Sequence, residues 1–147
     1  MANYKKILLA TDLSEFSGLV GGKALTIATT FNAELSLLHV VDFLPMLDSS
    51  YSEILPMEIG INEQMLEIVK GRLEELAKGL HIPKERQLLE LGSPKSEIVR
   101  VAKENGFEMI IVGTHGRRGL GILLGSTAAS VIHHASCDVL TIRLRDE

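Results

Sequence analysis

The strongest chemical signal in the sequence is a glycine-rich stretch, residues 113–127, that follows a short apolar run. It holds five glycines and ends in Ser126 and Thr127, where a helical pattern begins. Glycine lets backbone N–H groups approach an anion, and the positive end of the following helix strengthens the attraction. Arg117 and Arg118 add positive charge beside these amides. The stretch fits a phosphate site, and an ordinary strand-to-helix connection with a serine cap is the alternative.

Two standard phosphate motifs do not match this stretch. Gly116 and Gly121 have the glycine spacing of a Walker A loop, but Ile122 stands where that motif requires lysine. The run from Gly119 to Gly125 is one residue longer than the dinucleotide fingerprint, which also belongs on the first strand-to-helix turn of its unit. The sequence therefore excludes a P-loop and leaves NAD binding as a weak alternative.

Hydrophobic periodicity predicts the elements that must position this loop. Short apolar runs predict strands at 5–11, 35–41, 87–91, 107–112 and 138–144. Apolar steps of three and four residues predict helices at 14–31, 65–80, 94–105 and 126–135. Ser14 is the candidate N-cap of the first helix, and close packing against a neighbour would explain its Gly18, Gly21 and Gly22. This alternation predicts an α/β fold, an open doubly wound five-stranded parallel sheet with helices on both faces. Ligands of such sheets bind beyond the carboxyl ends of the strands, where the winding reverses.

Composition and charge predict the class of protein. The 147 residues match one domain, residues 1–147, because a domain usually holds about 100 to 200 residues. No apolar run approaches the roughly 18 residues that cross a bilayer, so we expect no membrane span. A net charge of -4 and an aromatic content of 4% argue against nucleic acid as a partner. With one cysteine, Cys137, and no secretory leader, the protein is expected in the cytoplasm.

Three segments together resemble universal stress proteins over essentially the whole chain: residues 10–14, the glycine loop and the C-terminal strand. The ATP-binding members of that family carry Gly, two residues, Gly, nine residues, then Gly followed by Ser or Thr. Gly113, Gly116, Gly125 and Ser126 match, but only eight residues separate Gly116 from Gly125. The further glycines in between could absorb the missing residue, since glycine reaches positive φ at little cost. The tail from residue 138 is similar to the UspA branch, which does not retain nucleotide.

The resemblance implies a set of nucleotide-binding residues. Thr11 and Asp12 would line the adenine and ribose side, and Val40 or Val41 would contact the adenine. The candidates from the loop are Gly113, Thr114, His115, Gly116, Arg117, Gly125, Ser126 and Thr127. For Asp12, a role as a turn or helix-capping carboxylate is about as well supported by the sequence as contact with the ligand. An exposed loop histidine without a role is the alternative for His115. His39, in the predicted strand 35–41, either faces the same crevice or packs.

The function that the resemblance implies is binding of ATP or another adenine nucleotide by a stress-response sensor or switch. Mg²⁺ would arrive on the phosphates, because adjacent His133 and His134 diverge on a helix and form no metal cluster. The sequence shows no clear general base or arginine finger, so no catalytic residue is assigned and any hydrolysis should be slow. The alternatives are a nucleotide-free dimeric adaptor and a slow ATPase.

The strand at 138–144 predicts a partner. Its apolar residues would form an exposed sheet edge, and such edges recruit further strands. A two-fold homodimer through this strand agrees with the resemblance. The alternative is an edge protected by the flanking Arg143 and Arg145.

Overall fold

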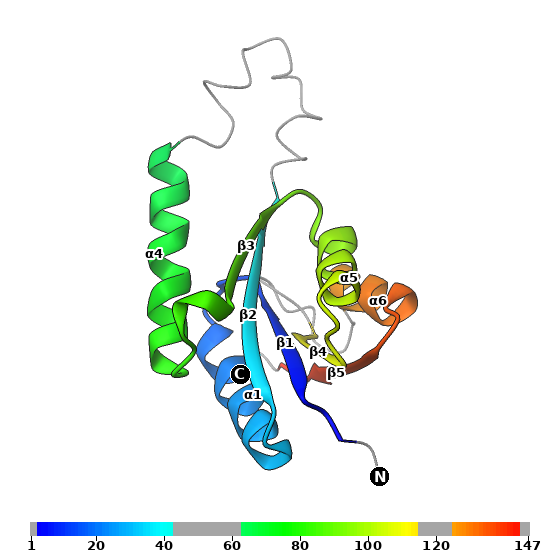
Figure 1. The fold of residues 1–147 in the computed structure, drawn as a ribbon. Helices are drawn as coiled ribbons and strands as arrows, with labels where there is room; N and C mark the ends of the chain where they lie inside the picture. Colours follow the sequence, from blue (N-terminus) through cyan, green and yellow to red (C-terminus); the bar gives the residue numbers. More distant parts are fainter. Residues whose placement is uncertain (1–2, 43–62, 115–124, 145–147) are drawn as a thin grey trace.

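Five parallel strands form one sheet in the computed structural model, which describes residues 3–42, 63–114 and 125–144 (Figure 1). The strands are β1 (Lys6–Thr11), β2 (Glu34–Val41), β3 (Gln87–Leu91), β4 (Met109–Gly113) and β5 (Asp138–Ile142), in the order β3-β2-β1-β4-β5. The helices are α1 (Ser17–Phe31), α4 (Glu63–Gly79), α5 (Pro94–Glu104) and α6 (Ser126–His134), with a short 3-10 helix, η2 (Lys84–Arg86). In the described ranges no helix is long and apolar enough to span a membrane. The predicted fold class is confirmed.

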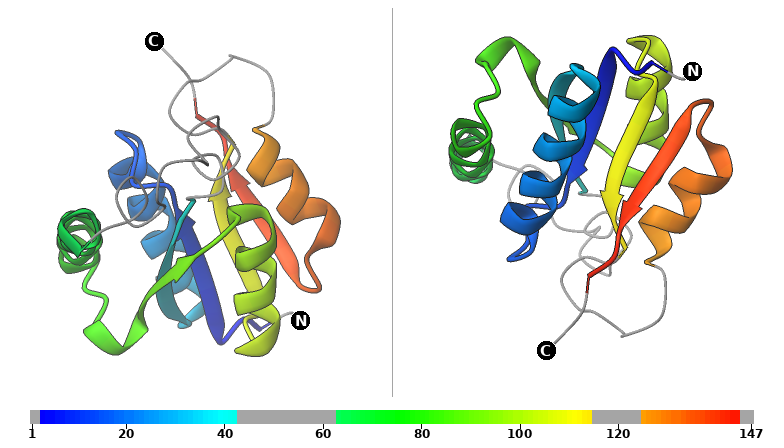
Figure 2. Two further views of the ribbon diagram at one scale, coloured as in Figure 1. Left: turned by 90° about the horizontal axis from the view of Figure 1, so that it is seen from above. Right: turned by 90° about the horizontal axis from the view of Figure 1, so that it is seen from below.

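Helices cover both faces of the sheet. Figure 2 shows α1 and α4 on one side and α5 and α6 on the other. Side chains alternate along a strand, so Ile7 and Leu9 belong to the core beneath α1 and α4, whereas Leu8 belongs to the core beneath α5 and α6. Because the central strands β1 and β4 are buried on both sides, their sequences are apolar runs rather than alternating patterns.

The winding of the sheet reverses between β1 and β4. From β1 the chain adds β2 and β3 on one side and then returns to add β4 and β5 on the other. All registered pairs are parallel. The helices that follow β1 and β4, α1 and α6, therefore lie on opposite faces of the sheet, as Figure 2 shows, which opens a crevice at the carboxyl ends of these strands.

The start of α1 differs from the prediction. We expected Ser14 to cap this helix, but α1 begins at Ser17 with Phe16 as its N-cap residue. Ser14 instead belongs to a turn, in which its hydroxyl accepts a hydrogen bond from the Phe16 amide at 3.2 Å. Leu13 lies in the left-handed region at φ 57°, a conformation that no helical turn contains. Polar residues just before a helical pattern of apolar residues occur in helix caps and in such turns, so the sequence alone does not distinguish the two.

The ends of the last two strands also differ from the prediction. β4 begins at Met109 rather than at Phe107, because the Phe107 amide bonds to the Ala102 carbonyl and closes the end of α5. β5 ends at Ile142 rather than at residue 144. Leu144 nevertheless belongs to the core, with 2% of its surface exposed. The apolar run therefore predicted burial correctly and strand length incorrectly.

One of the three glycines in α1 lies close to a packed side chain. A Cβ atom at Gly21 would lie 2.9 Å from Leu80 Cδ1, so a larger residue there would force the Leu80 side chain, just after α4, to shift. At Gly18 and Gly22 a Cβ atom would meet no heavy atom within 4 Å. The close packing that we expected for all three glycines applies to Gly21.

This difference predicts opposite responses to the same substitution. Gly22→Ala should stabilise the fold by about 1 kcal/mol, because alanine is the better helix former and its methyl group has space. In Gly21→Ala the contact with Leu80 should offset that gain, so the two variants should differ by about 1 kcal/mol or more. Urea unfolding measures both values, and equal stabilisation would contradict the close approach.

Candidate functional site

A cleft of about 710 Å³ lies at the carboxyl ends of β1, β2 and β4, where the winding reverses. The predicted residues that line it are Thr11, Asp12, Val40, Val41, Gly113, Thr114, Gly125, Ser126 and Thr127. His115, Gly116 and Arg117 lie outside the described residues, and so does the loop whose length departs from the family pattern. The structure thus brings together candidates that come from four separate segments of the chain.

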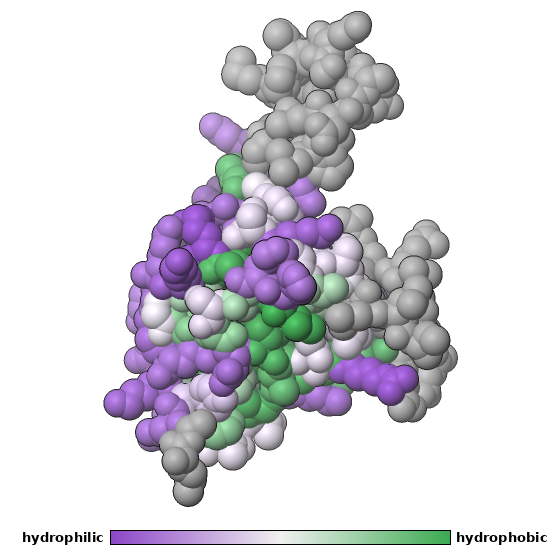
Figure 3. All heavy atoms as spheres, turned by 90° about the vertical axis from the view of Figure 1, so that its right-hand side faces the viewer, coloured by the Kyte–Doolittle hydropathy of each residue, from purple (hydrophilic) through white to green (hydrophobic). Residues whose placement is uncertain are grey.

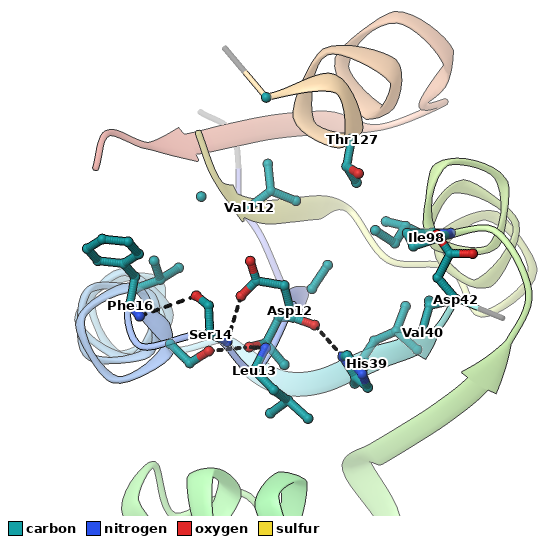
Figure 4. Close-up of a pocket in the computed structure, with 18 of the residues that line it drawn as sticks. Asp12, Leu13, Ser14, Phe16, His39, Val40, Asp42, Ile98, Val112 and Thr127 are labelled. Atoms are coloured by element: carbon teal, nitrogen blue, oxygen red, sulfur yellow. Dashed lines mark hydrogen bonds between the residues drawn. The ribbon is translucent and has the colours of Figure 1, made fainter. Parts of the chain in front are cut away.

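Strand alternation divides the candidates between two sides of the cleft. Val40 belongs to the core beneath α5 and α6, together with Ile98. Val41 and His39 point to the opposite face of β2, toward α4. Figure 4 shows Val40, Ile98 and Thr127 around one common space. Of the two valines that were candidates for an adenine contact, the geometry favours Val40.

Asp12 lies in the crevice between β1 and β4. Its Oδ1 atom accepts a hydrogen bond from the Ser14 amide at 2.9 Å, so the carboxylate stabilises the turn that leads to α1. Figure 4 shows the same carboxylate directed toward the side of the cleft where Val112 lies. The turn role that we considered for Asp12 is therefore observed, in a position from which the carboxylate also faces the open space of the cleft.

Thr11 stabilises the same turn. Its hydroxyl accepts a hydrogen bond from the Leu13 amide at 3.0 Å and lies 3.0 Å from the Ser17 hydroxyl. Its carbonyl oxygen lies 2.8 Å from Nδ1 of His39. Thr11 lines the cleft as expected, but these contacts show its side chain engaged with the backbone around it.

His39 is a neutral donor at the edge of the cleft. A carbonyl can only accept, so the contact with Thr11 places the ring proton on Nδ1. Burial lowers the pKa of His39, while the hydrogen bond to Thr11 and the charge of Asp12 act in the opposite direction. We had left open whether His39 faces the crevice or packs; it does both, because it lines the cleft and joins β2 to the end of β1.

The start of α6 supplies hydrogen-bond donors to the cleft. Gly125 is the N-cap residue, and its amide donates to the Thr114 carbonyl. The amides of Ser126, Thr127 and Ala128 belong to the first turn, where a helix offers no acceptor of its own. All three residues line the cleft, and the first turn carries no acidic residue. The positive end of the helix therefore faces a space where an anion can lie.

Gly113 has a packing role that the sequence did not indicate. A Cβ atom there would lie 3.0 Å from Leu144 Cδ1 and 3.4 Å from Val20 Cγ2. The glycine thus makes room for a side chain that returns from the end of the chain. Gly113 lines the cleft, as expected for a nucleotide-binding candidate, and the described contacts give it a packing role in the core as well.

Several lining residues were missed as site residues. Ile98 and Pro94 come from α5, and Met65, Val69 and Arg72 come from α4. Helical periodicity placed Ile98 on the core-facing side of its helix, but that pattern does not show where a core meets a cleft. Within the described ranges no group of three or more His, Cys, Asp or Glu side chains is arranged to hold a metal ion.

The pKa shift of His39 makes the stability of the fold depend on pH. Since the folded pKa lies below the ordinary value of 6.5, the contribution is complete above pH 6.5 and is lost as pH falls below that value. In His39→Asn the amide nitrogen takes the place of Nδ1 and does not titrate. Urea midpoints measured between pH 7.5 and about pH 5 should therefore fall more steeply for the natural chain than for the variant. Parallel profiles would contradict the assignment.

Relatives of this chain share one family name. The model of the Universal stress protein family matches residues 3–143. Universal stress protein A homolog 2 of Coxiella burnetii is 38% identical over 146 residues, which is 99% of each chain. Universal stress protein MJ0577 of Methanocaldococcus jannaschii is 32% identical over 157 residues, with 97% of each chain covered.

Solved structures agree with this relationship. The structure of MJ0577 superposes with a TM-score of 0.77 at 28% identity and covers 99% of this chain and 100% of that one. The crystal structure of a universal stress protein in complex with cAMP has a TM-score of 0.69 at 22% identity, with 97% and 98% covered, a likeness of fold. With its parallel sheet, its cleft at the reversal of winding and a family match along almost its whole length, the chain belongs to the universal stress protein family.

Proposed function

We propose that the cleft binds an adenine nucleotide, ATP or a close relative, and that the protein acts as a stress-response sensor or switch. The protein would act in the cytoplasm as one domain, residues 1–147, with Mg²⁺ carried by the phosphates. The observation that supports the proposal is that one cleft combines hydrogen-bond donors for an anion with an apolar surface for a base. The first turn of α6 offers amides to an anion, and the apolar pair Val40 and Ile98 lies across the same space.

The base end of the proposed ligand would lie against apolar side chains. Val40 and Ile98 are buried, with 6% and 5% of their surfaces exposed, so the surrounding core holds their positions. A flat aromatic base covers such a wall without displacing ordered polar groups. The Asp12 carboxylate, which lines the same cleft, can accept a hydrogen bond from an amino group or a ribose hydroxyl.

The phosphate end would lie against α6. The chain carries a net charge of -4, so attraction at long range does not explain an anion site. Amides fixed at a helix start act at short range, and Ser126 and Thr127 add hydroxyl donors. A structural neighbour holds cAMP, so this fold is able to bind an adenine nucleotide.

We also propose a homodimer through β5. β5 is the outer strand of the sheet, next to β4, and within the described residues no further strand pairs with the backbone groups of its far side. Figure 3 shows hydrophobic residues gathered on the side of the molecule where α5, α6 and β5 lie. Ile132 of α6 is 48% exposed, and Val139 and Leu140 of β5 are half-buried. Such an edge favours a second copy of the chain over water.

Sedimentation measures the dimer directly. The protein should have twice the 16.1 kDa mass of one chain at micromolar concentration. A single-chain mass at every concentration up to about 1 mM would contradict the β5 dimer, because even a weak interface with a dissociation constant near that value would be visible.

The nucleotide site predicts a difference between two glutamate variants of α6. Thr127 points into the cleft, so Thr127→Glu places a carboxylate where the phosphates would lie and should weaken ATP binding at least about ten-fold. The same charge in the first turn of a helix is favourable, by about 0.3 to 1 kcal/mol, so the fold should remain stable. Ala129→Glu is the matched control, since Ala129 is exposed, one turn into the same helix and outside the cleft lining.

Melting with and without ATP and Mg²⁺ provides the measurement. The natural chain and Ala129→Glu should gain about 2.7 kcal/mol at a ligand concentration 100 times the dissociation constant. Thr127→Glu should gain much less. Equal shifts in the two variants would place the ligand elsewhere. A natural chain without any shift at millimolar ATP would contradict the proposal and support a nucleotide-free adaptor, and phosphate release over hours would indicate a slow ATPase.

A further inference from the structure

Thr114, the first residue after β4, joins three separate segments of the chain. Its amide donates to the Ile142 carbonyl at 3.0 Å, and its hydroxyl Oγ1 accepts a hydrogen bond from the Leu144 amide at 3.0 Å. Its carbonyl accepts the amide of Gly125 at the start of α6. One residue therefore connects the end of β4, the stretch that follows β5, and the helix whose amides line the cleft.

The hydroxyl takes the place that a backbone carbonyl holds in a regular parallel ladder. Gly113 is paired with Ile142, and the Thr114 amide continues this ladder by one bond. In a parallel pair the next bond would run from the Leu144 amide to the Thr114 carbonyl. Here the Leu144 amide bonds to the Thr114 hydroxyl instead, and the carbonyl is used by Gly125. The side chain thus allows one residue to satisfy both β5 and α6.

Packing holds the stretch after β5 against β4 and α1. Leu144 is buried, and a Cβ atom at Gly113 would approach its Cδ1 atom to 3.0 Å. This added Cβ atom would also lie 3.4 Å from Val20 Cγ2 of α1. If the stretch after β5 shifted, the Leu144 side chain would therefore collide with Gly113, which lines the cleft.

We propose that Thr114 is a positioning residue of the nucleotide site and that it couples this site to the C-terminal end of β5. Its hydroxyl satisfies the Leu144 amide, which leaves the carbonyl to fix Gly125 and hence the direction of the α6 amides. This assignment gives Thr114, one of the candidate nucleotide-binding residues, a role that acts through the start of α6. The inference rests on the proposed function for its effect on nucleotide, and coupling between two sites acts in both directions. A nucleotide on α6 therefore protects the Leu144 amide.

Valine and serine at position 114 separate the hydroxyl from the shape of the side chain. In Thr114→Val the side chain keeps its branching but offers no acceptor, so the amides of Leu144 and Gly125 compete for one carbonyl. Thr114→Ser keeps the hydroxyl and should rescue the junction. Thr29→Val, on the exposed surface of α1, is the control for the same chemical change away from the cleft.

Calorimetric titration with ATP and Mg²⁺, together with NMR hydrogen exchange at the Leu144 amide, tests the proposal. We expect Thr114→Val to weaken ATP binding by about three- to ten-fold, as for one lost hydrogen bond, while the serine variant and the control bind as the natural chain does. Without nucleotide, the Leu144 amide should exchange faster in Thr114→Val than in the natural chain or in Thr114→Ser. In the natural chain ATP should slow this exchange further. Circular dichroism verifies that each variant is folded.

Three results would overturn the proposal. Thr114→Val could bind ATP and protect the Leu144 amide as the natural chain does. Thr114→Ser could be as impaired as Thr114→Val, which would assign the effect to the methyl group. ATP could leave the Leu144 exchange unchanged while it binds. If the natural chain binds no ATP, the proposed function and the coupling fail, whereas the exchange rates without nucleotide still decide whether the hydroxyl replaces the carbonyl.

Discussion

The constraint on which the rest of the structure depends is that a parallel sheet must be covered on both faces. Strands buried on both sides need apolar residues at every position, and β1 supplies Ile7, Leu8 and Leu9 in direct succession to two different cores. Right-handed crossovers then require that the winding reverse once if helices are to reach both faces. The reversal between β1 and β4 leaves strand ends whose next residues are covered by neither layer. The cleft is thus a consequence of covering the sheet.

Polar side chains hold the edges of this cleft because the backbone leaves regular structure there. Leu13 has a left-handed conformation that is unfavourable for a branched side chain by roughly 1 to 2 kcal/mol, and its amide is bound by the Thr11 hydroxyl. The Thr11 carbonyl in turn accepts the ring of His39. A strained turn persists only where its surroundings determine it, and here the amides of Leu13, Ser14 and Phe16 are each bound by a side-chain oxygen. This edge of the cleft is therefore preorganised.

The sequence was sufficient to predict the two helical layers around the sheet. It also predicted nine of the residues that line the cleft, because both features depend on local patterns. Buried strands read as apolar runs, and the glycine stretch before Ser126 marked the start of α6. Tertiary relations were not predictable in this way. Ile98 looked like any core residue of a helix, and no local pattern indicates that the Thr114 hydroxyl meets an amide 30 positions later. Ser14 was taken for a cap because caps and turns use the same hydroxyl chemistry.

The junction at Thr114 also bears on the loop that is one residue shorter than the family pattern. The hydrogen bond between the Thr114 carbonyl and the Gly125 amide fixes both ends of the ten-residue connection between them. With fixed ends, one residue more or less changes the closure entropy of such a loop by only about 0.1 kcal/mol. The direction of the α6 amides follows from the junction and from the packing of Leu144 against Gly113, and neither depends on the length of the connection. An anion site built on a helix start can therefore tolerate a change of loop length, whereas a site built on loop amides could not.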